Sequence, residues 1–283
     1  MTSLTQVTGA APARRKSGLA GNIGLALSVL VVVIVVAWAL WPGLFTATDP
    51  AAVDTADRLQ PPSGAHLFGT NQLGQDVYAR TVHAASITLS AAALAVGLGF
   101  VLGSILGLLA GYLRGWVDEV IMRIVDVFLS IPAILLSIAI VASLGFGIVE
   151  IGVAVGITSM ATFARVMRSS VLQNAQAVYV EAATMSGARW YTVLWRHILP
   201  NSITPVVSLI ALEFGVALLA ISSLSFLGFG APPDVPEWGA LISAGRDYMA
   251  TAWWLTVLPG LVISIVVLAT SYISNRIARA GKS

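Results

Sequence analysis

Six long apolar stretches run along the chain, separated by short polar connections and three longer ones. Each stretch is close to the length of about 20 apolar residues that a helix needs to cross a bilayer. Runs of this length favour membrane-spanning helices over strands. Only 144–147 separates the third stretch from the fourth. The predicted spans are 23–41, 84–112, 120–143, 148–167, 203–226 and 253–273.

Composition agrees with this pattern. Of the 283 residues, 57% are hydrophobic and 10% are charged, and the mean hydropathy is +0.89. Soluble domains carry about 25% charged residues, so a soluble enzyme and a disordered chain are both excluded. We expect an all-α integral membrane protein. Cysteine is absent, which excludes disulfides and thiolate chemistry, and the 15 basic residues form no patch that would indicate nucleic-acid binding.

The placement of basic residues predicts the orientation. With the N-terminus in the cytoplasm, eleven Lys and Arg residues fall on the inner side and three on the outer side, as the positive-inside rule requires. The first apolar stretch exceeds the 7–15 residues of a signal peptide and is interpreted as a retained anchor. The predicted parts are a cytoplasmic tail (1–22), a first transmembrane helix (23–42), an extracytoplasmic segment (43–83), a five-helix core (84–275) with a cytoplasmic loop (168–201), and a cytoplasmic tail (276–283).

Glycines recur every fourth residue in the second stretch, at Gly99, Gly103, Gly107 and Gly111. Residues at this spacing share a helix face, and without side chains they let another backbone approach closely. The pattern predicts a packing seam. Its partner is a helix of the same chain or a helix of a second subunit.

Few charges lie inside the predicted spans. Asp126 follows Arg123 by three positions, which predicts a local ion pair on one helix face. Glu213 lies deeper, so it must face a partner, a cavity or water, or be protonated; it is a candidate pathway or packing residue. Pro132 and Pro259 predict local kinks in the third and sixth spans.

The connection between the fourth and fifth spans has the pattern of a helical hairpin. A helix is expected before Gly187, which can adopt a positive φ and end it. A second short helix is expected at 188–197, with Pro200 as its stop. This element is too elaborate for a simple linker and indicates a seat for another protein, although its basic residues could instead face lipid headgroups. Small residues and one aromatic residue share a face of the first helix: Tyr179, Ala182, Ala183 and Ser186.

At this hairpin the chain resembles the membrane subunits of binding-protein-dependent ABC importers, whose signature loop reads E-A-A, three residues, G, nine residues, I-x-L-P. The signature positions are matched by Glu181, Ala182, Ala183, Gly187, Leu199 and Pro200, with His197 in place of the isoleucine. Within the family, the chain resembles the oligopeptide/dipeptide/nickel permease group, in its second-permease form. Three strings carry this likeness, namely 66–80, 196–201 and 224–230, although Gln75 stands where the group often has Arg.

The resemblance covers about residues 20–275 and implies a type I ABC importer fold with six transmembrane helices in a bacterial inner membrane. It implies three kinds of protein partner: a homologous second permease, two ATPase subunits and an extracytoplasmic solute-binding protein. Membrane lipid is a further partner, and nucleic acid is not. The chain itself would bind no cofactor, because ATP and Mg²⁺ belong to the ATPases. The residues that the resemblance implies for ATPase coupling are Tyr179, Glu181, Ala182, Ala183, Gly187, Ala188, Leu199 and Pro200.

Two other classes of function have less support in the sequence. A secondary transporter would be expected to show inverted repeats or paired charges within the membrane, and no repeat is visible. An intramembrane enzyme is not supported, because His66, His83 and His197 are scattered and no H-E-x-x-H or G-x-S-x-G motif occurs. The expected cargo is a dipeptide or oligopeptide, with nickel or another small solute as the alternative.

Overall fold

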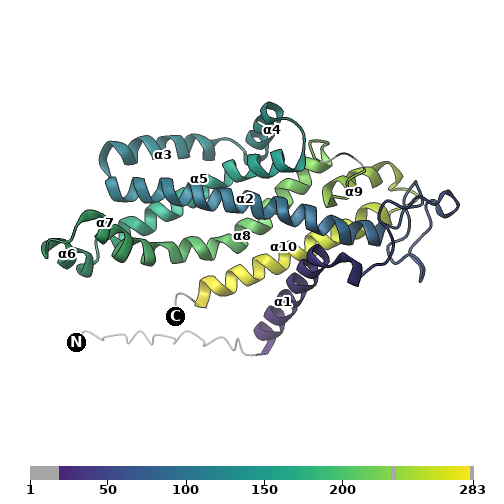
Figure 1. Ribbon diagram of the computed structural model, residues 1–283, viewed down its shortest axis with the longest axis horizontal. Helices are drawn as coiled ribbons and strands as arrows, with labels where there is room; N and C mark the ends of the chain where they lie inside the picture. The colour runs from purple at the N-terminus through teal and green to yellow at the C-terminus, as the bar shows by residue number, and fades with distance from the viewer. Residues whose placement is uncertain (1–18, 231, 233, 281–283) are drawn as a thin grey trace, which may run out of the picture.

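A computed structural model describes residues 19–230, 232 and 234–280; the predicted tail residues 1–18 and 281–283 lie outside this part of the chain. The described residues form helices joined by irregular segments, with one isolated β-bridge between Thr70 and Asp76 and no strand (Figure 1). The helices are α1 (Leu19–Leu40), α2 (Val77–Leu113), α3 (Gly115–Ser130), α4 (Ala133–Leu144), α5 (Ile148–Asn174), α6 (Val178–Met185), α7 (Trp190–Val193), α8 (Leu199–Phe226), α9 (Trp238–Gly245) and α10 (Trp254–Ala280).

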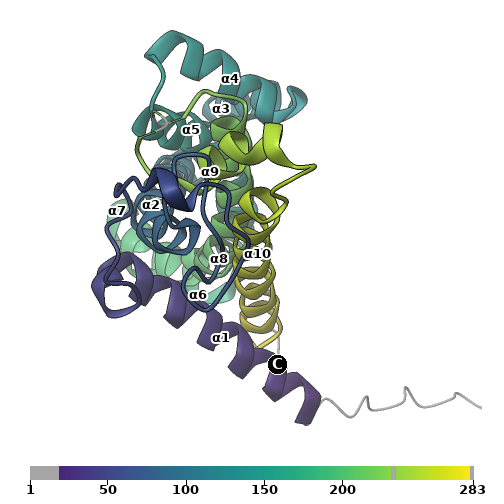
Figure 2. The ribbon, with the colours of Figure 1, turned by 90° about the vertical axis from the view of Figure 1, so that its right-hand side faces the viewer.

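The predicted membrane class is confirmed. Five helices (α1, α2, α5, α8 and α10) are long and apolar enough to cross a bilayer, and the bent pair α3 and α4 makes a sixth crossing if it is counted as one span. The central helices α2 and α5 pack along each other, with α8 beside them (Figure 1). In Figure 2, α1 and α4 lie on opposite sides of the bundle. Large apolar side chains of α1 stay exposed, as expected for a helix that faces lipid.

The second helix begins earlier than the predicted start at residue 84. Asp76 caps its N-terminus, because the Asp76 carboxylate accepts a hydrogen bond from the Ala79 N–H at 2.8 Å. The 37 residues of α2 give a length of about 55 Å, well beyond the ~30 Å hydrocarbon core. Two turns of α2 therefore belong to the segment that hydropathy had assigned to the extracytoplasmic side.

The third predicted span is wrong as a single, locally kinked helix. It is divided into α3 and α4, whose axes differ by 99°. Pro132 cannot donate a backbone hydrogen bond, and it forces the preceding Ile131 into an extended conformation with φ −94° and ψ 134°. Pro259, by contrast, lies inside the continuous helix α10.

The end of the predicted hairpin also differs. Pro200 does not stop a helix at 188–197 but lies in the first turn of α8, where a missing N–H costs little. A π-helical turn at Leu194–Ile198 joins α7 to α8, and the Leu199 N–H reaches back five residues to the Leu194 carbonyl. The wider turn leads the chain into α8 without a break. We call residues 175–198 the surface hairpin.

Candidate functional site

The surface hairpin protrudes at one end of the long axis, and α9 and the segment between α1 and α2 lie at the other (Figure 1). Its first helix, α6, ends in a Schellman turn. The Gly187 N–H donates to the Thr184 carbonyl at 3.0 Å, and the Ala188 N–H donates to the Ala183 carbonyl at 3.1 Å. Gly187 has φ +83°, which confirms the positive φ predicted for it. The turn therefore depends on a residue without a side chain.

The predicted coupling residues divide between two faces of this hairpin. Ala183 and Ala188 are half-buried and pack toward the helix bundle, and Leu199 and Pro200 belong to the start of α8. The remaining members, which are exposed and available to another molecule, are Tyr179, Glu181, Ala182 and Gly187.

Exposed apolar side chains of the hairpin were missed as candidates. Val178 and Met185, at the two ends of α6, are 81% and 79% exposed. Trp190 and Trp195 are also largely exposed. The signal that could have identified them is the presence of several large apolar residues within one short polar connection.

The hairpin is tied to the spans at defined points. The Tyr112 hydroxyl, at the end of α2, donates to the Trp190 carbonyl at 3.1 Å. The Asn174 side chain, at the end of α5, donates to the Ser202 hydroxyl of α8 at 3.2 Å. Three spanning helices, α2, α5 and α8, thus converge at the base of the hairpin.

The glycine series of α2 packs against α5 of the same chain. A Cβ atom at Gly99 would contact the Ser159 hydroxyl, one at Gly103 the Met160 carbonyl oxygen, and one at Gly107 the Ala164 carbonyl oxygen. We call this contact the α2–α5 seam. It accounts for the glycine spacing through packing within the chain, the first of the two alternatives.

Asp126 does not pair with Arg123 as predicted. Its carboxylate accepts a hydrogen bond from the Arg165 guanidinium of α5 at 2.7 Å. One helical turn further on, Arg168 donates twice to Asp118, at 2.5 and 2.6 Å. These two ion pairs attach α3 to α5. The local spacing rule failed because the arginine on the facing helix lies closer than the one on the same helix.

Glu213 lines a cavity of about 460 Å³ between α3, α4, α5 and α8. The bend at Pro132 turns α4 away from the line of α3, and the cavity lies under this bend. Hydroxyl-bearing side chains from three elements share the wall with apolar groups. They are Ser130, Ser137, Thr158, Ser159 and Thr162.

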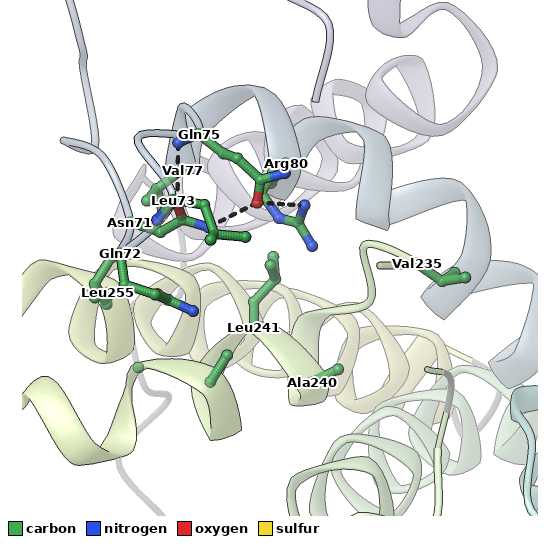
Figure 3. A pocket seen from close by; sticks show the side chains of 12 residues that line it. Asn71, Gln72, Leu73, Gln75, Val77, Arg80, Val235, Ala240, Leu241 and Leu255 are labelled. Atoms are coloured by element: carbon green, nitrogen blue, oxygen red, sulfur yellow. Dashed lines mark hydrogen bonds between the residues drawn. The ribbon is translucent and has the colours of Figure 1, made fainter. Parts of the chain in front are cut away.

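The opposite end of the molecule is held by polar contacts around the start of α2. Gln75, the departure from the permease group, accepts hydrogen bonds from Arg80 at 2.9 Å and from Asn71 at 2.8 Å, beside a small pocket against α9 (Figure 3). Glu237 is buried and caps α9 by accepting from the Ala240 N–H at 2.9 Å. Burial raises the pKa of the Glu237 carboxyl. The hydrogen bonds that this carboxyl accepts, including the one from Ala240, oppose the rise. These contacts hold the start of α2 and of α9 in place. No cluster of metal-binding side chains occurs anywhere in the described residues.

Comparison with known proteins defines the family. Residues 103–280 match the model for the binding-protein-dependent transport system inner membrane component. The chain belongs to this family. It is 40% identical over 247 residues to the glutathione transport system permease protein GsiD of Pectobacterium atrosepticum, covering 87% of this chain and 82% of that protein. It is 42% identical over 250 residues to the GsiD protein of Shigella flexneri serotype 5b, covering 88% and 82%.

Solved structures share the fold of this permease. An amino acid ABC transporter chain aligns with a TM-score of 0.57 at 18% identity, covering 71% of this chain and 94% of that one. A chain of the inward-facing MetNI methionine transporter aligns with a TM-score of 0.58 at 19% identity, covering 71% and 95%. The type I importer architecture expected from the sequence is confirmed, and the protein is a permease subunit of an ABC importer.

Proposed function

We propose that this permease forms half of a peptide translocation pathway and is driven by ATPase subunits that grip its surface hairpin. The observation that carries the proposal is the exposure of Val178 and Met185 at the two ends of α6, on a hairpin that projects from the bundle (Figure 1). Large apolar side chains exposed on a protruding element favour a protein partner.

Coupling needs no chemistry in this chain. ATP and Mg²⁺ bind the ATPase subunits, whose closure displaces α6. The displacement reaches α2 through the Tyr112 hydrogen bond to Trp190, and reaches α8 through the continuous π-helical connection. The nucleotide supplies the conformational preference, because an equilibrium shifts only by the ligand's differential affinity for the two states.

The pathway requires a second, homologous permease chain, and an extracytoplasmic binding protein delivers the cargo. We infer that both termini and the surface hairpin are cytoplasmic in a bacterial inner membrane, because the reversed orientation would place eleven basic residues outside. The cargo is a short peptide. The relatives are named for glutathione transport, which narrows the peptide class expected from the sequence toward di- and tripeptides.

Single cysteines test the hairpin directly, because the chain contains none. Met185→Cys in the assembled complex should crosslink to an ATPase subunit, in a yield that changes with ATP. A membrane-impermeant maleimide should reach it only after permeabilisation. Leu73→Cys, also exposed but near the opposite end, is the matched control and should be labelled from outside. Labelling of Met185→Cys in intact cells, or crosslinks that never reach the ATPase, would refute the proposal.

A further inference from the structure

The cavity under the α3–α4 bend combines an apolar wall, a ring of hydroxyl groups and one ionisable side chain. Among its lining residues Glu213 is the only one that can carry a charge. Its volume of about 460 Å³ lies in the range of 300–1,000 Å³ typical of small-molecule sites, which is sufficient for a short peptide. The cavity is partly open, so a ligand has a way in.

Glu213 lies near the middle of α8 and is only 9% exposed. No hydrogen bond or ion pair joins its carboxyl group to another of the described residues. An isolated carboxylate at this depth in a membrane protein is costly, and such residues mark pathways for polar substrates. Two carboxylates of α3, Asp118 and Asp126, are each paired with an arginine of α5. Glu213 is therefore a buried carboxylate, deep in a spanning helix, without a partner among the described residues.

We propose that Glu213 binds the ammonium group at the amino end of the cargo during its passage, and that the hydroxyls of Thr158 and Thr162 on α5 hydrogen-bond its peptide groups. A free amino group is a feature that glutathione shares with unmodified linear di- and tripeptides, so one carboxylate serves cargo of differing side chains. The cavity wall offers no basic group that would compete for Glu213. The inference rests on the proposed peptide-import function and adds a subsite to it.

A basic side chain from the second permease is the competing occupant. It would neutralise Glu213 permanently and make the residue an assembly contact. The two roles differ in one measurable respect: a cargo subsite distinguishes cargo with an amino group from cargo without one, whereas an assembly contact treats both alike.

The test uses the complete importer in liposomes with saturating binding protein, and two labelled tripeptides that differ only in acetylation of the amino end. The uptake ratio of the two peptides is compared between variants, so that the preference of the binding protein cancels. Glu213→Gln should reduce uptake of the free-amino peptide about tenfold, or about 1.4 kcal/mol. Uptake of the acetylated peptide should change less than twofold.

Two further variants keep the test decisive. Glu119→Gln makes the same chemical change on the exposed surface of α3 and should leave the ratio unchanged. Thr162→Lys places a cation in the cavity without altering Glu213, and should again disfavour the free-amino peptide; it replaces Glu213→Gln if that variant does not assemble. Equal losses for both peptides in either cavity variant would overturn the subsite. Wild-type complex that imports neither peptide with ATP would instead overturn the proposed peptide function.

Discussion

The α2–α5 seam and the surface hairpin both depend on glycine, but for opposite physical reasons. In the seam, Gly103 has ordinary helical geometry, and a Cβ atom there would collide with the backbone and side chains of α5. In the hairpin, a Cβ atom at Gly187 would meet no other atom within 4 Å, but the φ of +83° disfavours any residue that has one. One glycine is required by its neighbours and the other by its own backbone.

This difference matches the tasks of the two regions. The seam fixes two spans at close range by shape, because lipid provides little hydrophobic drive for helix association. The hairpin instead presents exposed side chains on a turn that is closed by local backbone hydrogen bonds, with open space around Gly187. Changes in the seam should therefore reduce folding, and changes in the hairpin should reduce coupling while the fold survives.

The largest effect is expected from Gly103→Leu. The new side chain must push α5 away, and overpacking of this kind costs about 3 kcal/mol. The yield of monodisperse protein in detergent and its thermal stability should both fall sharply. Gly97→Leu is the matched control, because Gly97 lies on the same helix with nothing within 4 Å and should be tolerated. Equal losses in the two variants would show that the seam has no special need for glycine.

Gly187→Ala is expected to have a smaller effect, on a different quantity. An L-residue in the left-handed region costs about 1–2 kcal/mol, which destabilises the turn and not the bundle. ATP-dependent uptake should fall several-fold with normal protein yield, and Gly187→Asn should retain more activity because asparagine tolerates this conformation. Gly64→Ala, at an open position without a positive φ, serves as the control. Uptake at the wild-type rate in Gly187→Ala would show that coupling does not depend on the conformation of this turn.

The sequence predicted those features that depend on neighbouring residues. Long apolar runs gave the helices, and the glycine at position 187 gave the turn that ends α6, because both are decided within one helical turn or one span. The glycine spacing predicted a close contact but not its partner. Only the three-dimensional packing identifies that partner as α5, which begins about 50 residues after Gly99.

The features that sequence reasoning missed depend on distant residues or on a competition between rules. Pro132 signals an interruption in any helix, but its surroundings decide whether the result is a kink or the observed 99° bend. Arg165 lies 39 residues from Asp126, beyond the reach of a local spacing rule. Glu213 was identified as a candidate by its depth in the predicted span. The cavity that it lines could not be predicted, because that cavity depends on the bend between α3 and α4.

Charge should contribute to the attachment of α3 to α5, as shape does to the α2–α5 seam, but with a smaller effect. Asp118→Asn removes the negative charge and one of the two oxygens that accept hydrogen bonds from Arg168. The side chains of Asp118 and Arg168 are 18% and 33% exposed. The expected destabilisation is about 1 kcal/mol, measured by thermal unfolding in detergent. Arg168→Gln should give a similar loss, and the double variant should show non-additivity. Additive losses would contradict a direct interaction.

The smallest effect is expected from Asp126→Asn. This carboxylate makes one hydrogen bond to Arg165, and the two side chains are 61% and 58% exposed. Exposed ion pairs contribute about 0.2–1 kcal/mol, and the contribution decreases as salt is added. The melting temperature should therefore change by little, and less at high salt than at low salt. A loss larger than that of Asp118→Asn would mean that lipid or a partner subunit shields this pair from water. Charge on the α3 side of α5 would then rank beside the shape of the α2–α5 seam in holding the permease together.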